Sequence, residues 1–533
     1  MSLLDVRNLS VRFGGVTAVD DVSFSLERGA TLGIVGESGS GKSVTCRALM
    51  RLLSPNARIE GTADFEGRDL LSLPEKALDG VRGKRIAMIF QTPASHLDPL
   101  MRIGDQVSET LHKHTDMRGR AVREEVVRLL DVVRIPDPEK WVRAFPHQLS
   151  GGMKQRVMIA GALACQPDLL LADEPTTALD ATVQKSVLDL LAQLRRERNL
   201  SMIFVSHDLG AVARVCDDLV VMRRSKVMES GRVKDIIRAP QHEYTKKLIA
   251  SHPDRLPNRP LDAVPDAAPL VEAKGVKIRY GVRSLADLIA AREGGFVAVK
   301  DASFAVRPGE SLGIVGESGS GKTTLARALV GLVKPNDGRF LFDGKTADPT
   351  GPGRVVYLRD MQLIYQHPYE ALNPRMTVQS AIAEPLRRHR LCPRDQVEAR
   401  VRDLMAQVEL SPDLAGRLPG QLSGGQCQRV AIARALAFDP RVLIADEVTS
   451  ALDVTLQAQV LALLARLQKE RGLTMIFISH DLAVIRRLCN SVIVMRQGEI
   501  VEAGPTASVF DTPREIYTRE LIDAIPHLEG CSA

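Results

Sequence analysis

Short apolar runs rich in β-branched residues alternate along this chain with stretches of helical spacing. The run TLGIV at 31–35 leads into a glycine-rich loop, and SVTCRALMRLL at 43–53 follows with apolar residues at helical intervals. The later runs LLLA at 169–172 and MIF at 202–204 have the length of buried strands. Strands that alternate with helices in this way predict an α/β domain built on a mainly parallel sheet.

Several sequence blocks occur twice in the same order, which indicates an internal duplication. GESGSGKS at 36–43 returns as GESGSGKT at 316–323, and LSGG at 149–152 returns at 422–425. LLLADE and MIFVSHDL in the first half return as VLIADE and MIFISHDL, each 273 residues later. One offset shared by several blocks predicts two copies of a large domain rather than a solenoid of short repeats.

The two copies are separated by a proline-rich stretch. Residues 251–270 contain five prolines and few large apolar residues, a composition that favours an extended, semi-rigid connection. We therefore expect a first domain at 1–250, a linker at 251–270 and a second domain at 271–533. An extra segment near 281–295 in the second copy is interpreted as a surface insertion.

Composition excludes several classes of protein. The 71 basic and 65 acidic residues give a net charge of only +6, which predicts a mixed-charge surface and no nucleic-acid partner. No apolar run approaches the roughly 18 to 20 residues needed to cross a bilayer. Asp5 and Arg7 interrupt the N-terminal stretch that a signal peptide would keep apolar, so we expect a cytoplasmic protein. Seven cysteines lack the spacing of a metal or redox pair and are interpreted as reduced thiols: Cys46, Cys165, Cys216, Cys392, Cys427, Cys489 and Cys531.

The glycine-rich loops carry the chemistry of phosphate binding. Glycines let backbone N–H groups turn inward around phosphate oxygens, and the helix that follows adds the positive end of its dipole. A lysine would neutralise the β- and γ-phosphates, and the next hydroxyl would bind Mg²⁺. The two predicted loops comprise Gly36, Glu37, Ser38, Gly39, Ser40, Gly41, Lys42 and Ser43, and Gly316, Glu317, Ser318, Gly319, Ser320, Gly321, Lys322, Thr323 and Thr324.

Two acids end a predicted buried strand in each copy. Asp173 and Asp446 would hold Mg²⁺, directly or through water. Glu174 and Glu447, the next residues, would polarise the water that attacks the γ-phosphate. Strand-end carboxylates also serve as simple caps, but the neighbouring phosphate loop favours catalysis.

Further polar residues end other predicted strands. His207 and His480 stand in the SHD sequences after MIF, where γ-phosphate sensing is favoured over a structural role by the recurrence in both copies. Gln91 and Gln366 follow MIF and LIY, within reach of Mg²⁺ or the attacking water. Neither glutamine would carry that prediction alone.

The LSGG blocks predict a second anion site in each copy. A serine followed by glycines at the start of a helix binds an anion by capping and dipole interactions. The residues are Ser150, Gly151 and Gly152 in the first copy, and Ser423, Gly424 and Gly425 in the second. Because each copy already has a phosphate loop, the second anion site is expected to close over the nucleotide of the other copy.

Taken in order, these motifs resemble the ATP-binding-cassette (ABC) ATPases over nearly the whole chain, in both copies. The resemblance implies two tandem P-loop nucleotide-binding domains of the α/β class, each with a mainly parallel sheet core, an antiparallel β subdomain and a helical subdomain. It also implies ATP and Mg²⁺ as ligands and a head-to-tail pairing of the cassettes. The residues expected to face each other are Lys42, Gln91, Glu174 and His207 with Ser423 and Gly425, and Lys322, Gln366, Glu447 and His480 with Ser150 and Gly152.

The family resemblance also implies an aromatic contact with adenine, and the second copy departs from the first at two notable positions within the motifs. Phe13 and Tyr280, upstream of the phosphate loops, are the candidates to stack on adenine, with packing in the core as the alternative. Val448 replaces the Pro175 of the first copy and Cys427 replaces Lys154, and neither touches a predicted catalytic atom. Both sites are therefore expected to hydrolyse ATP.

Two further stretches in each copy narrow the branch. HLDPLMRIGDQVSE at 96–109 and ALNPRMTVQSAIAEPL at 371–386 resemble the region after the glutamine in peptide importers. HEYTKKLIASHP at 242–253 and EIYTRELIDAIP at 515–526 resemble the tail of dipeptide, oligopeptide and nickel importer ATPases. Such a resemblance implies a peripheral subunit at the cytoplasmic face of the inner membrane, with two transmembrane permeases and, indirectly, a periplasmic solute-binding protein as partners. With only Cys531 near the C-terminus, no iron–sulfur cluster is expected.

The sequence leaves the solute open. Short peptides are the leading expectation, and nickel, opines or glutathione-like compounds are alternatives, because solute contacts lie in other polypeptides. A tandem-cassette ATPase acting on ribosomes is the rival from another class. That branch typically joins its cassettes by a long charged helix, whereas this linker is short and rich in proline.

Overall fold

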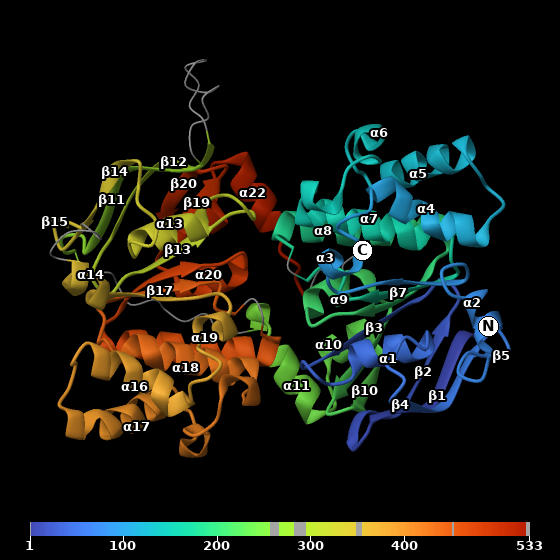
Figure 1. The fold of residues 1–533 in the computed structure, drawn as a ribbon, viewed down its shortest axis with the longest axis horizontal. Coiled ribbons are helices and arrows are strands. Elements are labelled where there is room, and N and C mark those ends of the chain that lie inside the picture. The colour runs from blue at the N-terminus through green and yellow to red at the C-terminus, as the bar shows by residue number, and fades with distance from the viewer. Residues whose placement is uncertain are drawn as a thin grey trace. The chain divides into compact units, whose positions relative to one another are not determined.

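The chain divides into two compact units, seen in the computed structural model of Figure 1. Unit 1 comprises Met1–Leu179, Val183–Arg255 and Pro526–Ala533, and unit 2 comprises Asp180–Thr182 and Leu256–Ile525. The structure describes residues 2–177, 179–255, 266–281, 295–347, 354–449 and 452–528. The middle of the predicted linker, 256–265, and most of the predicted insertion at 281–295 lie outside these residues.

Unit 1 alternates strands and helices as the sequence pattern predicts. Its strands are β1 (Ser2–Phe13), β2 (Val16–Glu27), β3 (Thr31–Gly36), β4 (Ala57–Phe65), β5 (Arg68–Asp69), β6 (Ile86–Ile89), β7 (Leu169–Asp173), β8 (Ser201–Val205), β9 (Asp218–Arg223) and β10 (Lys226–Arg232). Its helices are α1 (Lys42–Leu49), α2 (Glu75–Asp79), α3 (Pro93–His96), α4 (Ile103–His114), α5 (Arg120–Val132), α6 (Pro138–Trp141), α7 (Gly151–Leu163), α8 (Ala181–Arg198), α9 (Leu209–Val215), α10 (Val233–Arg238) and α11 (Glu243–Ala250).

Two sheets organise unit 1. The larger has the order β10-β9-β3-β8-β7-β6, and all its neighbours are parallel except β9 and β10. Every residue of β3, β7 and β8 is buried, as expected for parallel strands covered on both faces. A smaller antiparallel sheet has the order β2-β1-β4-β5. Helix α1 packs against strands of both sheets (Figure 1), which places the loop before it at the strand ends of the larger sheet.

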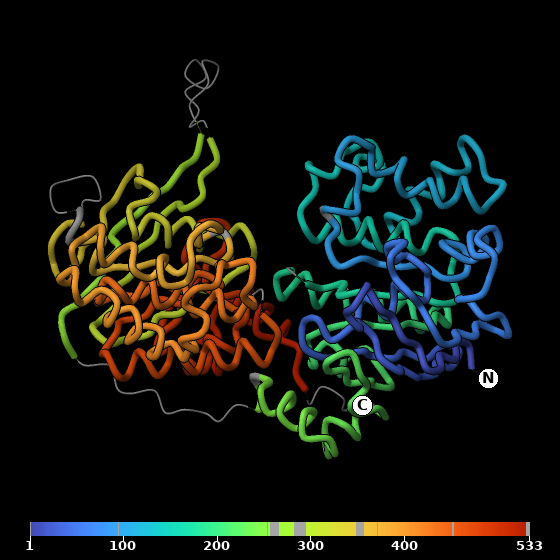
Figure 2. The backbone as a smooth tube through the Cα atoms, turned by 60° about the horizontal axis from the view of Figure 1, so that its bottom comes forward, coloured from blue at the N-terminus to red at the C-terminus, as the bar shows by residue number. Residues whose placement is uncertain are grey.

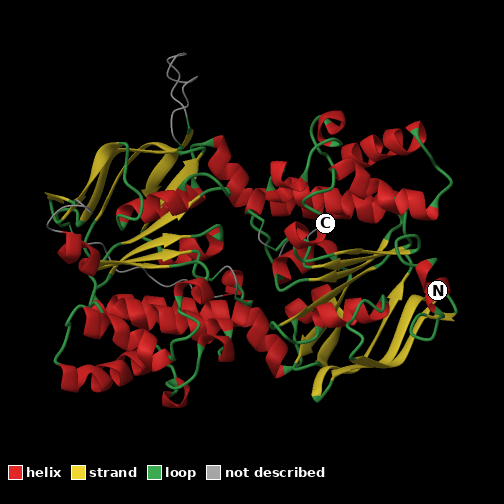
Figure 3. Ribbon diagram, in the orientation of Figure 1, coloured by secondary structure: helices red, strands yellow, loops and turns green. Residues whose placement is uncertain are grey.

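Helices α4, α5 and α7 pack against one another as a separate helical layer; they are labelled in Figure 1 and occupy the same place in Figure 3, where every helix is red. On α5 the buried residues Val122, Val126, Leu129 and Leu130 recur at helical spacing and produce one apolar face. This face belongs to a core that includes buried residues of α4, α7 and α8. Each feature of the predicted fold class, the parallel core, the antiparallel subdomain and the helical subdomain, is thus present in unit 1.

Unit 2 repeats the succession of elements. Its strands are β11 (Val271–Tyr280), β12 (Phe296–Val306), β13 (Ser311–Val315), β14 (Asp337–Phe342), β15 (Lys345–Thr346), β16 (Met361–Ile364), β17 (Val442–Asp446), β18 (Thr474–Ile478), β19 (Ser491–Arg496) and β20 (Glu499–Pro505). Its helices are α13 (Lys322–Leu329), α14 (Arg354–Asp360), α15 (Pro368–Ala371), α16 (Val378–Arg388), α17 (Val397–Gln407), α18 (Gly424–Leu436), α19 (Val454–Arg471), α20 (Leu482–Leu488), α21 (Thr506–Asp511) and α22 (Ile516–Asp523).

The strand order of unit 2 matches that of unit 1. The order is β15-β14-β11-β12-β20-β19-β13-β18-β17-β16, and one pairing, between Asp301 and Glu499, joins the antiparallel part to the parallel part. In unit 1 a corresponding hydrogen bond runs from the Asp20 N–H to the Ser225 carbonyl (2.8 Å). The duplication inferred from the sequence is therefore a duplication of the whole fold.

The described end of the C-terminal segment completes the core of unit 1. Leu528 is buried among core residues of this unit, and its N–H donates to the Asp254 carboxylate (2.9 Å). A Cβ added at Gly210, on α9, would lie 2.6 Å from the Pro526 carbonyl oxygen. Figure 2 shows the red end of the tube beside the green segment that follows α11.

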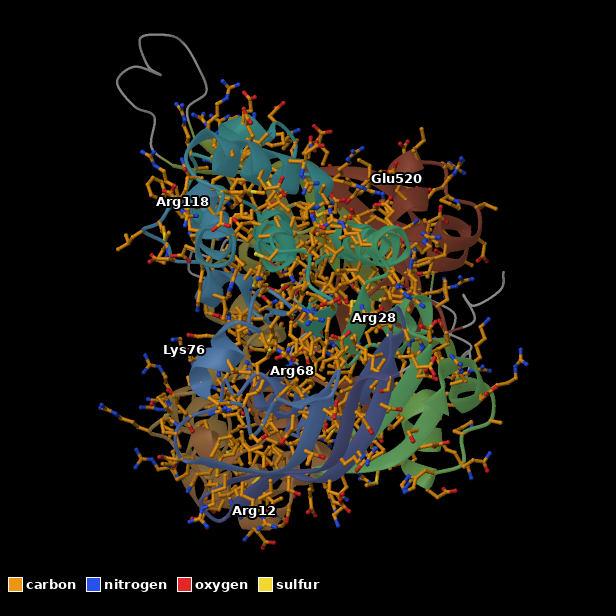
Figure 4. The ribbon with its side chains drawn as sticks, turned by 90° about the vertical axis from the view of Figure 1, so that its right-hand side faces the viewer. Arg12, Arg28, Arg68, Lys76, Arg118 and Glu520 are labelled. Atoms are coloured by element: carbon orange, nitrogen blue, oxygen red, sulfur yellow. The ribbon has the colours of Figure 1, made fainter. Side chains whose placement is uncertain are left out.

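Charged side chains are distributed over unit 1. Arg12, Arg68, Lys76 and Arg118, labelled in Figure 4, come from β1, β5, α2 and the loop between α4 and α5. Arg28 pairs with the carboxylates of Glu66 and Asp168, so basic and acidic groups are interspersed here. The prediction that the chain does not bind nucleic acid stays a prediction. Among the described residues, no helix combines the length and apolarity that a bilayer crossing needs.

Candidate active site

The phosphate loop of unit 1 runs from β3 to α1 and approaches its neighbours closely. Gly36 (φ 153°) and Gly41 (φ 100°) have left-handed backbones, and an added Cβ would lie 2.0 Å from the Met222 carbonyl oxygen or 2.4 Å from that of Ala18. Only glycine fits at these points. The buried Lys42 ammonium donates to the carbonyls of Gly36 (2.8 Å) and Glu37 (2.9 Å), so the lysine lies across its own loop.

Unit 2 reproduces this loop between β13 and α13. Lys322 donates to the carbonyls of Gly316 and Glu317, both at 2.7 Å. Burial is the main reason that the pKa of Lys322 is lowered, although Glu447 and other nearby carboxylates oppose the shift. Both lysines are held where a phosphate chain entering the loop would meet them.

The acids predicted to bind Mg²⁺ lie next to the hydroxyl that opens each helix. Ser43 Oγ donates to Asp173 Oδ1 at 2.6 Å, and Thr323 Oγ1 donates to Asp446 Oδ1 at 3.2 Å. Burial raises the pKa of both aspartates, to about 6 for Asp446. Buried carboxylates with raised pKa values are suited to a cation that stabilises their ionised form.

The Glu174 carboxylate, at the end of β7, has three polar side chains around it. Its Oε2 accepts hydrogen bonds from Gln91 Nε2 (2.7 Å) and Thr177 Oγ1 (2.8 Å), and His207 Nδ1 lies 3.4 Å away. Its backbone is left-handed (φ 48°), and its N–H donates to the Val205 carbonyl (3.0 Å). A non-glycine residue in this conformation is unusual and fixes the direction of the carboxylate.

Glu447 has the same surroundings in unit 2. Gln366 Nε2 donates to Glu447 Oε2 at 2.6 Å, His480 Nδ1 lies 3.5 Å away, and the glutamate φ is again 48°. Ser450, the counterpart of Thr177, lies outside the described residues. The predicted acid, glutamine and histidine of each copy are thus brought together by three separate strands.

Each glutamate and its histidine stabilise one another's charged forms. Burial pushes the pKa of Glu174 upward, but the hydrogen bond and charge of His207 outweigh it and lower that pKa to about 2. Burial likewise lowers the pKa of His207, and Glu174 more than reverses the shift, so the histidine pKa is raised. The directions are the same for Glu447 and His480. Each pair therefore favours a glutamate that is an ionised acceptor for a water proton.

The neighbours of the histidine explain the SHD sequence. Asp208 caps α9 by accepting from the N–H groups of Gly210 (2.8 Å) and Ala211 (3.2 Å), and its own N–H donates to Ser206 Oγ (2.9 Å). Asp481 does the same for α20. Serine and aspartate hold the turn rigidly, so that the histidine between them projects toward the glutamate.

The residues present fit Mg²⁺. Asp173 Oδ2 is buried and accepts no hydrogen bond from the described part of the chain, with Arg47 Nη2 at 3.8 Å. Ser43 and Gln91 offer further oxygens, and Mg²⁺ takes oxygen ligands together with substrate phosphates. Within the described ranges no three His, Cys, Asp or Glu side chains cluster as a metal site, so a resident all-protein cage of that kind is not found there.

The LSGG serines cap helices, as predicted. Ser150 Oγ accepts the Met153 N–H at the start of α7, and Ser423 Oγ accepts the Gln426 N–H at the start of α18, both at 3.3 Å. In unit 2 the Gln426 side chain also accepts the Ser423 N–H (3.0 Å), which makes a reciprocal capping box. The role of Ser150, Gly151, Gly152, Ser423, Gly424 and Gly425 at the other copy's nucleotide stays a prediction.

The adenine candidates end equivalent strands. Phe13 is partly buried and packs against the core of unit 1, whereas Tyr280 is 42% exposed. Tyr280 pairs with Phe296, which is 66% exposed, so unit 2 offers a second aromatic side chain at this place. The sequence reasoning missed Phe296, since it follows the predicted insertion rather than the upstream strand.

Two other contributions were missed. Thr177 donates to Glu174, a role that the threonine-rich sequence after the strand-end acids did not reveal. Tyr244 and Tyr517 accept hydrogen bonds from the phosphate loops, although both stand in tail stretches about 200 residues downstream. Only contacts across the fold expose these residues.

Comparison with known proteins agrees with the geometry. The family model described as ABC transporter matches residues 19–177 and 299–450. A second model, described as oligopeptide/dipeptide transporter, C-terminal region, matches residues 228–280 and 501–532. The first model thus matches once in each copy, and the second matches at the end of each copy, its first match continuing through the linker to residue 280.

Similar proteins are found along the full chain. The glutathione import ATP-binding protein GsiA of Pectobacterium atrosepticum is 45% identical over 98% of this chain and 89% of its own length. That of Escherichia coli strain K12 is 43% identical over 99% and 90%. The structure of cbiO1 from Clostridium perfringens, part of the ABC transporter complex cbiONQ, is 29% identical, with a TM-score of 0.41 over 46% of this chain and 91% of that one. The two family models and the full-length similarity to the GsiA proteins show that this chain belongs to the ABC transporter ATPases, as a tandem-cassette member with the C-terminal regions of the oligopeptide/dipeptide transporters.

Proposed function

We propose that this ABC importer ATPase powers the uptake of a short peptide of the glutathione type, with both copies hydrolysing ATP. The observation that carries the proposal is the complete constellation of lysine, two acids, glutamine and histidine in each unit. The two matches to the oligopeptide/dipeptide C-terminal region support a peptide as the solute. We also propose 1–250 and 271–533 as the two cassettes.

In each copy the chain's own residues supply binding, orientation and a base. Lys42 or Lys322 exchanges its loop carbonyls for the β- and γ-phosphates of ATP, and the loop N–H groups bind the remaining phosphate oxygens. Glu174 or Glu447, ionised by its histidine, orients and polarises the attacking water. Gln91 or Gln366 donates a hydrogen bond to the same carboxylate oxygen that the histidine approaches and so helps to fix its direction.

Mg²⁺, when bound, supplies positive charge that offsets the charge developing on the phosphates. Ser43, Asp173 and Gln91 would hold it in the first copy, and Thr323, Asp446 and Gln366 in the second. The buried aspartates, with raised pKa values, are the groups that such a cation would keep ionised.

Permease subunits are the proposed partners, docked beside the two glutamines. Leu100, in the loop between α3 and α4, is 87% exposed, and Tyr365 and Tyr369 are partly exposed next to Gln366. These exposed side chains are the contacts that we propose for the permeases. Arg375 of unit 2 occupies the position of Leu100, so the two docking surfaces differ and favour two non-identical permeases.

Glutathione is the first solute to test. The relatives are named for glutathione import, and the tail regions match peptide transporters, whereas nickel and opines have no such support here. A periplasmic binding protein would deliver the solute to the permeases, with this chain at the cytoplasmic face of the inner membrane. The ribosome-acting alternative is disfavoured by the same relatives.

A trapped complex tests the proposal. A tagged Glu174→Gln, Glu447→Gln variant expressed in its host should bind ATP without hydrolysis and co-purify with two different multi-span membrane proteins. The Lys42→Ala, Lys322→Ala variant is the matched control, which should lose the ATP dependence of this association. Ribosomes without permeases would overturn the importer role.

Uptake then identifies the solute. Cells that lack the chromosomal gene should take up labelled glutathione when they express the wild-type chain, and not when they express the Glu174→Gln, Glu447→Gln variant. A labelled dipeptide is the parallel substrate. Restored dipeptide uptake without glutathione uptake would replace glutathione by the dipeptide as the solute.

A further inference from the structure

A buried tyrosine of the C-terminal region touches the phosphate loop in each unit. Tyr244, on α11, and Tyr517, on α22, are both nearly inaccessible to solvent. Tyr244 Oη accepts the Glu37 N–H at 3.1 Å, and Tyr517 Oη accepts the Glu317 N–H at 3.0 Å. The same contact thus occurs in both copies. It comes from tail stretches that the proposed catalytic mechanism does not otherwise use.

The bonded N–H belongs to the peptide group that also holds the lysine. The carbonyl of the Gly36–Glu37 peptide accepts Lys42 Nζ (2.8 Å), while the N–H of that peptide donates to Tyr244. In unit 2 the Gly316–Glu317 peptide is held by Lys322 (2.7 Å) and Tyr517 in the same way. A peptide that follows a left-handed glycine has no Cβ to restrict it, so these two bonds define its orientation.

The tyrosine is itself held in place from two sides. The Arg223 guanidinium lies 4.6 Å from the centre of the Tyr244 ring, and Arg496 lies 4.7 Å from that of Tyr517. Near the start of α11, Glu229 of β10 accepts the His242 N–H (3.1 Å). Glu502 of β20 accepts the Glu515 N–H (3.3 Å) at the start of α22. The hydroxyl is therefore fixed relative to the strands that carry the site.

We infer that Tyr244 and Tyr517 are positioning residues for ATP binding. When the lysine turns to the phosphates, its bond to the glycine carbonyl is given up, and the tyrosine hydroxyl becomes the side-chain contact that keeps the peptide in its orientation. The N–H groups that follow in the loop then stay directed at the phosphates. This inference rests on the proposed role of the loops and adds the C-terminal region as their support.

Removing only the two hydroxyls tests the inference. The Tyr244→Phe, Tyr517→Phe variant keeps both rings and their arginines but loses the bonds to Glu37 and Glu317. One lost hydrogen bond per loop should raise the Kd for a fluorescent ATP analogue and the KM for ATP by roughly two- to tenfold, with kcat within twofold. The thermal midpoint without nucleotide should match that of the control.

Tyr357→Phe is the matched control, because Tyr357 is also buried but, within the described residues, makes no hydrogen bond with a phosphate loop. Its hydroxyl, on α14, contacts Met361 Sδ at the start of β16 (3.6 Å). Single variants in Lys322→Ala or Lys42→Ala backgrounds assign the effect to one loop. An unchanged Kd for the double tyrosine variant would overturn the inference. A higher Kd accompanied by a loss of thermal stability large enough to account for it would also overturn it. Normal ATP binding by the Lys42→Ala, Lys322→Ala variant would instead contradict the proposed ATP site itself. The lysine variant thus tests the site, and the tyrosine variants test only the support of the loop.

Discussion

The two copies have nearly identical contacts around the proposed catalytic glutamates, and different supporting contacts in the elements that carry them. Gln91 and Gln366 lie 2.7 and 2.6 Å from their glutamates, and the histidines lie 3.4 and 3.5 Å from the same carboxylates. In contrast, the start of α18 has a reciprocal capping box, whereas Met153 leaves α7 with the serine cap alone. The lysine, acid, glutamine and histidine side chains around the proposed phosphate site are therefore the same in both copies, while the elements that carry them are stabilised by different contacts.

Other differences lie just outside the shared contacts. Gly210 on α9 accommodates the Pro526 carbonyl, and its counterpart on α20 is Ala483. The serine hydroxyl in unit 1 lies 2.6 Å from Asp173, but the threonine hydroxyl in unit 2 lies 3.2 Å from Asp446. Each difference can be removed by substitution, which makes the comparison open to experiment.

The largest expected effect tests whether the catalytic contacts are equivalent. Replacing both Glu174 and Glu447 by glutamine should lower kcat for ATP by roughly 10²- to 10⁴-fold, because a general base is lost. The two single variants should lower kcat by the same factor as each other. Phosphate release measures this, with ATP binding unchanged as the control. Strongly unequal single variants would show that only one copy hydrolyses.

A second experiment tests the packing difference at Gly210. Gly210→Ala places a Cβ against the Pro526 backbone and should destabilise unit 1 by about 1–3 kcal/mol. Calorimetric unfolding and faster hydrogen exchange of the Leu528 N–H would report the displaced segment. Ala483→Gly is the matched change in unit 2 and should cost only about 0.5–1 kcal/mol, with exchange at Leu528 unaltered.

The capping difference should be worth about 1 kcal/mol. Gln426→Met removes the bond to the Ser423 N–H and should destabilise the start of α18, while Met153→Gln should stabilise α7 by adding the missing bond. Hydrogen exchange at the first turn of each helix is the measurement. Equal exchange before and after both substitutions would contradict the proposed importance of the capping box.

The smallest expected effect is the pH dependence of the two aspartates proposed to bind Mg²⁺. Because the pKa of Asp446 is raised to about 6, roughly three quarters of this group is protonated at pH 5.5, and Mg²⁺-dependent ATP binding by unit 2 should weaken roughly fourfold there. The folded form binds this proton more tightly than the unfolded form, so stability falls as pH rises from about 4 to 6 and then levels off. A fluorescent ATP analogue titrated at several pH values in the Lys42→Ala background isolates this copy.

Unit 1 is the internal reference for that titration. Burial also raises the pKa of Asp173, but the closer Ser43 hydroxyl opposes the shift. The Lys322→Ala background should therefore show a weaker loss of binding at pH 5.5. A loss that is larger in unit 1 than in unit 2 would reverse the proposed order of the two acids.

Much of the site could be predicted from local sequence. Lys42, Asp173 and Glu174 stand in short motifs whose order along the chain implies strand, loop and helix, and the structure places Lys42 and Glu174 close enough to Asp173 for their charges to act on its pKa. The prediction made from Gln91 alone was weaker, because a glutamine after a strand can have many roles. Its bond to Glu174 depends on β6 and β7 being neighbours in the sheet.

The sequence by itself determined the duplication, the α/β class and which groups are proposed to meet phosphate, since periodicity and spacing are local properties. Only the tertiary structure decided that Thr177 joins Glu174 and that Tyr244 and Tyr517 brace the loops. It also decided that Leu528 completes the core of unit 1. The physical reason is that hydrogen bonds and burial depend on distances between segments far apart in the chain, which packing sets and no local pattern encodes.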